Sequence, residues 1–361
     1  MESGKKSACG LYPLVLEPIF KYRIWGGRRL EKMLGKKLPA GEPIGESWEV
    51  SCRNGDNNVI RNGELAGSTL ADVFKTNREA LVGPSLFDRS KFPLLNKFID
   101  ANDLLSVQVH PDEKAAAQIA EAEAKTEAWY VIHADPRTTL VKGLKPGVTK
   151  EMFENAVHTD SIPTLLNSFS VSAGDMIFVP AGCVHAMGKG LVICEIQQNS
   201  DTTYRVYDWG RVGTDGKPRQ LHVEQALQAI NFEDRSPDRV PPVKVAEGAN
   251  GRTYLIASPY FAAQMLTLVE PTKESAGKKR FESLMMVEGA AAIRAGDGGE
   301  TRVSTGDSVL IPACISDYAI VPLGRCVLLR IFVPDDIEQE IVQRLRSEGI
   351  AEESIRGIVF E

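Results

Sequence analysis

Long apolar runs and clustered cysteines are both missing from this chain of 361 residues. No run reaches 18 apolar residues, and the N-terminal MESGKKSACGLYPL lacks the apolar core of a signal peptide. The six cysteines are scattered without a CxxC pair, a pattern that predicts free thiols rather than a disulfide framework. We therefore expect a soluble, cytoplasmic protein.

Excess positive charge is absent as well. The chain has 42 Lys and Arg against 48 Asp and Glu, a net charge of −6. This balance argues against nucleic acid or a membrane surface as a partner, and leaves room for an anionic small molecule where cations cluster locally. With 43% apolar residues, the chain is long enough for one large core and we expect two.

Short strands separated by glycine and proline dominate the pattern, which favours a β-sandwich or barrel over a parallel α/β sheet. The expected strands include edge strands between residues 12 and 25, a strand over 44–51 with Glu46 and Trp48 on one face, and a strand over 92–99.

Helix signals are fewer. We expect a helix over residues 68–81 capped by Ser68, and a helical insertion at about 143–170 in which Thr149 is the N-cap. An Ala- and Glu-rich segment after Pro111-Asp112 is also predicted to be helical.

An internal repeat indicates two copies of one β-fold. VSAGDMIFVPA at Val171–Ala181 matches VSTGDSVLIPA at Val303–Ala313, and each has the GD turn, apolar strand and proline of a barrel hairpin. The predicted fold is mainly β, with two cupin-type (jelly-roll) barrels and the helical insertion.

The two copies are not equivalent in chemistry. The repeat places Asp317 opposite His185, and no histidine follows His222. We expect residues 1–235 to form a catalytic cupin domain and residues 236–361 a degenerate one.

A metal site is indicated by the stretch LLSVQVHPD. Ser106, Gln108 and His110 alternate with apolar residues, so they share one face of a strand. In a cupin barrel such a strand meets a later carboxylate and a histidine after the GD hairpin, which predicts convergence with Glu127 and His185. Two imidazoles, a carboxylate and an amide suit zinc with an exchangeable position, and iron or manganese would also bind.

A polar run from Glu195 to Arg211 begins on the strand after His185. Within it, Arg205 lies among aromatic residues, and a guanidinium held in that way suits bidentate binding of an anionic oxygen group.

Together, the motifs resemble the type I, zinc-dependent mannose-6-phosphate isomerases (phosphomannose isomerases) in their shorter bacterial form, members of the cupin superfamily. The likeness covers most of the chain and is strongest from residue 11 to about 232. It is carried by Trp25-Gly26, Gly45-Glu46-Ser47-Trp48, Leu105-Ser106-Val107-Gln108-Val109-His110-Pro111-Asp112, Lys125-Thr126-Glu127, Pro180-Ala181-Gly182, His185-Ala186 and Ser200-Asp201 followed by Arg205.

The resemblance implies one zinc ion per chain, held by Gln108, His110, Glu127 and His185. It implies a catalytic group made of Arg205, Lys125 and Glu195. It implies a substrate-binding group made of Lys97, Ser106, Trp25, Glu46 and Arg211. The Thr-Pro-Lys segment of longer relatives does not directly follow the arginine here, and Arg211 is the expected substitute for its phosphate-binding lysine.

The implied reaction interconverts mannose 6-phosphate and fructose 6-phosphate through an enediolate, which requires a proton carrier and positive charge beside the oxyanion. The proton carrier stays open between Glu195, Lys125 and a zinc-bound water. The expected partner is a sugar phosphate, without nucleic acid or membrane, and the protein is expected to be a monomer or homodimer. The rival hypotheses are a sugar-sensing cupin without catalysis and an iron cupin oxygenase, and the run through Arg205 favours the isomerase over both.

Overall fold

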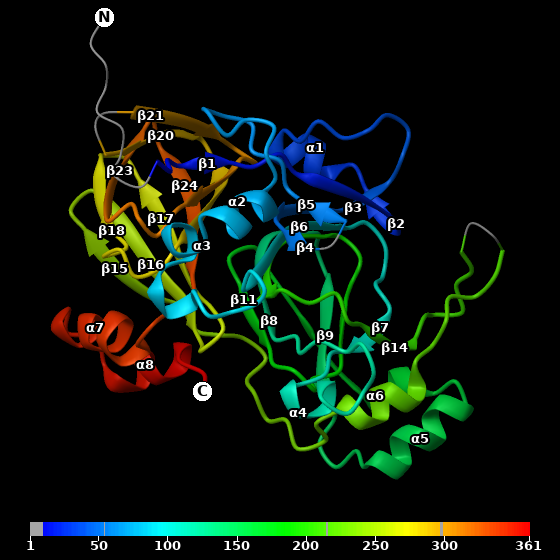
Figure 1. The fold of residues 1–361 in the computed structure, drawn as a ribbon. Coiled ribbons are helices and arrows are strands. Elements are labelled where there is room, and N and C mark those ends of the chain that lie inside the picture. The colour runs from blue at the N-terminus through cyan, green and yellow to red at the C-terminus, as the bar shows by residue number, and fades with distance from the viewer. Residues whose placement is uncertain (1–9, 54, 214–215, 297–298) are drawn as a thin grey trace, which may run out of the picture.

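The computed structural model describes residues 10–53, 55–213, 216–296 and 299–361, and within them the chain is mainly β (Figure 1). Figure 1 shows one group of sheets in blue to green and another in yellow to orange, with the cyan helices α2 and α3 between them. The prediction of a mainly β protein is confirmed.

Two sheets form the N-terminal half. The larger has the order β11-β8-β13-β6-β3-β2, with strands β2 (Ile19–Gly27), β3 (Ile44–Val50), β6 (Leu94–Ala101), β8 (Glu127–Ala134), β11 (Met176–Val179) and β13 (Leu191–Gln198). The smaller has the order β10-β9-β12-β7-β14, with β7 (Val107–Val109), β9 (Thr139–Leu144), β10 (Leu166–Ser170), β12 (His185–Met187) and β14 (Tyr204–Tyr207). A short pair, β4 (Cys52–Arg53) and β5 (Asp56–Asn57), lies apart from both.

The C-terminal half repeats this arrangement. Its larger sheet, β1-β22-β19-β24-β17-β16-β15, contains β1 (Leu14–Val15), β15 (Val243–Glu247), β16 (Asn250–Ala257), β17 (Ala262–Leu268), β19 (Glu282–Glu288), β22 (Ser308–Ile311) and β24 (Cys326–Phe332). Its smaller sheet, β18-β23-β20-β21, contains β18 (Thr272–Ser275), β20 (Ala290–Ala295), β21 (Gly299–Ser304) and β23 (Asp317–Pro322). The edge strand β1 belongs to this half although it comes first in the chain.

Each half is a sandwich whose apolar core lies between its two sheets. In the N-terminal half, Trp129 and Ile193 of the larger sheet share a buried cluster with Leu140 and Met187 of the smaller one. The described strands form open sheets rather than the closed barrels that we expected, because no ladder joins edge strand β2 to edge strand β14. Both of these strands contribute residues to the cavity described below, so a closed ladder there would obstruct its opening.

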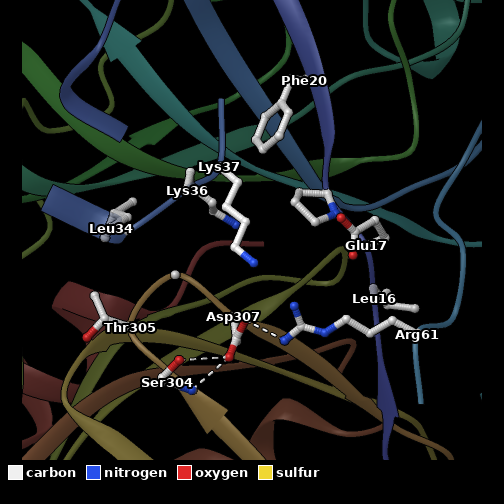
Figure 2. Close-up of a pocket in the computed structure, with 13 residues that line it drawn as sticks. Leu16, Glu17, Phe20, Leu34, Lys36, Lys37, Arg61, Ser304, Thr305 and Asp307 are labelled. Atoms are coloured by element: carbon white, nitrogen blue, oxygen red, sulfur yellow. Dashed lines mark hydrogen bonds and ion pairs between the residues drawn. The ribbon is translucent and has the colours of Figure 1, made fainter. Parts of the chain in front are cut away.

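The two sandwiches are joined by a continuous apolar core. Phe98 and Ile196, on the outer face of the first large sheet, share a cluster with Leu329 and Ile331 of the second. At the edge of this seam lies a cavity of about 320 Å³, where Arg61 pairs with Asp307 at 2.5 Å (Figure 2). The halves therefore pack as one body of sheet on sheet.

The repeat found in the sequence is a structural repeat. In the first copy the backbone N–H of Ser172 donates to Asp175 at 2.9 Å, and in the second that of Ser304 donates to Asp307 at 2.8 Å. The strands that follow, β11 and β22, begin and end at matching positions of the repeat. The matching turns and strands confirm that the two halves share one hairpin design.

The helices are short. They are α1 (Arg29–Leu34), α2 (Leu70–Thr76), α3 (Arg78–Val82), η1 (Pro84–Leu86), α4 (Glu113–Ala116), α5 (Lys150–His158), η2 (Ile162–Leu165), α6 (Val223–Ala229), η3 (Glu338–Val342), α7 (Gln343–Ser347) and α8 (Glu352–Ile358). Helices α5 and α6 cover the outer face of the smaller N-terminal sheet, because Phe153 and Ala226 pack in one cluster with Val107 and Val109.

The structure confirms one of the three helix predictions and corrects the other two. Thr149 caps α5 as predicted. The helix predicted over 68–81 is two helices that meet at Asn77, and its cap is Thr69, whose side chain accepts from the backbone N–H of Asp72 in a capping box. After Asp112 only α4 is helical, since the chain must turn back to begin β8 at Glu127.

Most of the described cysteines are free thiols, and the described helices do not span a membrane. Cys52, Cys183, Cys194 and Cys326 are free thiols as predicted, whereas Cys314 is disulfide-bonded and Cys9 lies outside the described residues. Within the described ranges, no helix combines the length and the apolar character needed to cross a bilayer.

Candidate active site

The predicted ligands converge between the two sheets of the N-terminal sandwich. Gln108 on β7 is the direct cross-strand partner of His185, the first residue of β12, and His110 follows β7. Glu127 comes from the opposite sheet, as the first residue of β8. Each sheet therefore supplies part of one cluster, which forms only when the sandwich closes.

The distances within this cluster suit a metal ion. One ligand atom from each of His110, Glu127 and His185 lies within 4.8 Å of the others. The Gln108 amide nitrogen is 3.2 Å from Nε2 of His185, so its side chain reaches the same point. His110 Nε2 is buried without a hydrogen-bond partner and lies 3.5 Å from Glu127 Oε2, a separation that allows both atoms to bind one cation.

Backbone carbonyls orient both imidazoles. His110 Nδ1 lies 2.7 Å from the Thr202 carbonyl oxygen, and His185 Nδ1 lies 2.9 Å from that of Cys183. A ring that donates through Nδ1 keeps the lone pair of Nε2 free, as metal ligation requires.

The protonation states also favour metal binding. Burial, helped by the nearby Lys125 ammonium, lowers the pKa of His110 to about 3, and burial lowers the pKa of His185. Burial would raise the pKa of Glu127, but Lys125 and the two imidazoles hold it well below its ordinary value. At neutral pH the cluster therefore offers two neutral imidazoles and one carboxylate.

A cavity of about 300 Å³ opens beside this cluster. Its lining includes the predicted residues Trp25, Glu46, Lys97, Ser106, Gln108, Lys125, Glu195 and Arg205, together with Arg23, Ile99, Leu105, Met187, Asp201, Thr203 and Arg219. Lys125 links the cavity to the cluster, because its ammonium lies 2.8 Å from Glu127 Oε2. The lining of the seam cavity in Figure 2 contains none of the predicted site residues, so we place the candidate active site in the cavity beside the metal-ligand cluster.

Charged side chains at one wall of the cavity form a chain. The Lys97 ammonium lies 3.0 Å from Glu195 Oε1, and the charges of Glu195 and Glu46 raise its pKa although burial opposes this. Burial would raise the pKa of Glu46, but Lys97 and Arg23 lower it to about 2. Burial raises the pKa of Glu195, which the Lys97 charge counteracts only in part. Lys97 thus pairs with Glu195 and lies within the field of the Glu46 carboxylate.

Of the two predicted arginines, Arg205 lies at the cavity and Arg211 does not. Arg205 on β14 faces the cavity, donates to the Gln220 carbonyl oxygen at 2.8 Å and keeps its buried Nε without a partner. Arg211 instead donates to the Leu104 carbonyl oxygen and to Asp208, and it is not among the lining residues.

Arg219 reaches the cavity in its place. Asp208 holds its guanidinium through Nε at 2.7 Å and Nη2 at 2.5 Å. No sequence pattern predicts this contact, because the spacing of residues in a polar loop does not indicate which arginine folds back toward the cavity.

Comparisons with known proteins agree with this geometry. Residues 14–154 match the family model of the phosphomannose isomerase type I catalytic domain. The chain is 39% identical over 252 residues to mannose-6-phosphate isomerase of Streptococcus mutans, covering 69% of this chain and 77% of the relative. It is 33% identical over 319 residues to mannose-6-phosphate isomerase ManA of Bacillus subtilis, covering 88% and 98%. The chain belongs to the type I phosphomannose isomerase family.

A solved structure supports the same assignment. The crystal structure of the mannose 6-phosphate isomerase from Bacillus subtilis superposes with a TM-score of 0.81 at 29% identity, covering 89% of this chain and 99% of that one. The match to the phosphomannose isomerase model includes Gln108, His110 and Glu127, and His185 lies beyond it.

The lowered histidine pKa values predict a pH-dependent stability in the metal-free protein. The pKa of His110 is 6.5 in the unfolded chain and about 3 in the folded chain. Between these values the unfolded chain binds a proton at His110 that the folded chain does not bind, so acidification favours unfolding. The free energy of unfolding should fall by up to about 1.4 kcal/mol per pH unit for one such histidine. Urea unfolding in a chelator at pH 7, 6 and 5 measures this slope.

The matched variants are His110→Asn and His158→Asn, of which the second changes an exposed residue on α5. His110→Asn should flatten the pH dependence, and His158→Asn should keep it. Equal slopes in wild type and His110→Asn would contradict this explanation.

Proposed function

We propose that this chain interconverts mannose 6-phosphate and fructose 6-phosphate at a zinc site made by Gln108, His110, Glu127 and His185. The observation that carries the proposal is the convergence of two neutral imidazoles and an ionised carboxylate beside a cavity lined with lysine and arginine. Relatives that bear the name mannose-6-phosphate isomerase support the reaction, and no comparison supports a sugar sensor or an iron oxygenase.

The donor set fits zinc. Imidazole nitrogen, carboxylate oxygen and amide oxygen are ligands that Zn²⁺ accepts, and three or four protein ligands leave a position for a small oxygen ligand. When bound, the ion supplies positive charge that stabilises the enediolate oxygens. The remaining steps belong to the side chains of the cavity.

Glu195 is the proton carrier in this proposal. Its carboxyl is buried in the cavity wall and its pKa is raised, which brings it nearer to the working pH of a general acid–base group. The ammonium of the alternative carrier Lys125 lies 2.8 Å from Glu127, a proposed metal ligand, whereas Glu195 pairs with Lys97, which is not a proposed ligand. We assign Lys125 to holding the Glu127 carboxylate and to adding charge beside the reacting carbons.

In this proposal, different residues of the cavity bind the oxyanion, the phosphate and the sugar of the substrate. Arg205 supplies fixed positive charge to the oxyanion, because its buried Nε still has a hydrogen bond to donate. Ser106 and Arg219 receive the phosphate, with Asp208 orienting the arginine. Trp25, Glu46 and Lys97 contact the sugar, and Arg211 supports the loop through Leu104 and Asp208.

We also propose that each sandwich is a jelly-roll unit of cupin type, with residues 1–235 forming the catalytic unit, helical insertion included, and residues 236–361 a degenerate one. Glu282 pairs with Ile311 as Glu127 pairs with Val179, so the two glutamates hold matching positions of the repeat. Among the described residues, the group of possible metal ligands is His110, Glu127 and His185, and Glu282 belongs to no such group.

The second unit holds a guanidinium where the first would hold a metal. Arg330 donates to Glu282 through Nε at 2.8 Å and through Nη2, and Tyr318 donates to the same carboxylate at 2.6 Å. A permanent cation therefore neutralises the buried charge, which supports one zinc per chain. A cytoplasmic location and a monomeric or homodimeric state complete the proposal.

Metal dependence tests this function. The purified protein should contain about one zinc per chain and lose mannose 6-phosphate isomerisation on chelation, because the ligands lose their cation. His185→Ala should lose both metal and turnover, whereas Asp317→Ala, at the matching position of the second unit, should keep both. Metal analysis and a coupled assay on the same samples check this, and full activity without metal would rule out the proposal.

Arg205→Ala should keep its zinc and lower kcat by roughly 10²–10³-fold, the scale for loss of one oxyanion donor. Lysine should restore little, because it keeps the charge without the planar fork. Steady-state kinetics beside a zinc measurement would detect this. An unchanged kcat would remove Arg205 from the chemistry.

Arg219→Ala should raise the KM for mannose 6-phosphate about 10- to 100-fold, since a charge-assisted hydrogen bond contributes about 1.5–3 kcal/mol. Unphosphorylated mannose is the matched control, because any kcat/KM measured on it should not change if Arg219 contacts only the phosphate. An equal loss on both sugars would assign Arg219 to the loop structure instead.

A further inference from the structure

Two strands of the large N-terminal sheet carry the same pattern, a glutamate followed two residues later by tryptophan. Residues i and i+2 of a strand point to the same face, so each indole can reach the carboxylate before it. On β3 the Trp48 Nε1–H donates to Glu46 at 2.7 Å, and on β8 the Trp129 Nε1–H donates to Glu127 at 3.1 Å. Only the second of these carboxylates belongs to the metal cluster.

Trp129 touches two of the proposed metal ligands. Its N–H donates to Oε1 of Glu127, the same oxygen that lies 3.4 Å from Nε2 of His185. Its ring also meets the His185 ring edge to face, with centroids 5.4 Å apart and an interplanar angle of 71°. The indole therefore contacts both the Glu127 carboxylate of one sheet and the His185 imidazole of the other, and it helps to fix their relative position.

The other oxygen of Glu127 is held from the opposite side. The Lys125 ammonium lies 2.8 Å from Oε2, so one carboxylate oxygen contacts an ammonium and the other accepts from an indole N–H. Without the indole, Lys125 would be the main remaining donor, and its charge would draw the carboxylate away from the point shared with His185.

Packing alone does not require tryptophan at this position. Trp129 has no solvent exposure and lies in the apolar core with Val131 and Ile193. A buried indole N–H must find an acceptor, so an aromatic residue without that group would fill the core at lower cost. The hydrogen bond to Glu127 is the feature that phenylalanine could not provide.

We propose that Trp129 is a positioning residue of the metal site, which sets the orientation of Glu127 through its indole N–H. This inference rests on the metal site of the proposed function. It adds a residue that does not ligate the metal and yet controls how tightly the metal is held. Outer partners of metal ligands commonly change affinity by about 10- to 100-fold when they are removed.

The experiment compares Trp129→Phe with Trp48→Phe. Both changes remove one indole from a buried position of the same sheet, and both break a hydrogen bond to a glutamate two residues earlier. The dissociation constant of Zn²⁺ is measured by chelator competition, and the visible spectrum of bound Co²⁺ reports the ligand geometry. Thermal unfolding of the metal-free proteins measures the loss of packing separately.

Trp129→Phe should bind Zn²⁺ about 10- to 100-fold more weakly and shift the Co²⁺ bands, whereas Trp48→Phe should match wild type in both. A purely structural role would lower the Tm of both metal-free variants without this difference in affinity. Wild-type affinity in Trp129→Phe, or an equal loss in Trp48→Phe, would overturn the inference. Failure of the wild-type protein to bind Zn²⁺ would instead reject the proposed function.

Discussion

The buried charge of Glu127 is the constraint on which the rest of this structure depends. The residue has no solvent exposure, and an isolated carboxylate in such a place would take up a proton rather than stay ionised. Lys125, His110 and His185 surround it, and its pKa is lowered as a result. These groups come from both sheets of the sandwich, so the apolar core that closes the sheets also assembles the cation site.

The second sandwich meets the same constraint by another route. Glu282 occupies the position of Glu127, is equally buried, and binds the guanidinium of Arg330. Since an arginine stays protonated, this carboxylate is neutralised permanently and leaves no site for a metal. One fold thus holds a buried glutamate either beside a candidate metal site that adjoins a cavity or against a built-in guanidinium.

Local patterns predicted the parts of this protein that depend on neighbouring residues. Alternation placed Gln108 and His110 on one face, and Thr149 was recognised as a cap from the residues after it. Local patterns failed where distant contacts decide. The segment after Asp112 has helical composition, but it must return to the sheet at Glu127, so only one turn of helix forms. Closed barrels were expected from the repeated hairpin. Strand periodicity carries no information on whether two edge strands pair, so the open edges at β2 and β14 could not be predicted.

The sequence by itself determined the mainly β class, the repeated hairpin and the residue types of the metal cluster, because strand period, turn glycines and ligand chemistry are local properties. The tertiary structure alone decided which arginine reaches the cavity. Arg211 and Arg219 both pair with Asp208, and only the fold of their loop directs Arg219 inward. It also decided that Lys97 is neutralised by two carboxylates, because Glu46 and Glu195 approach it from neighbouring strands that sequence spacing cannot align.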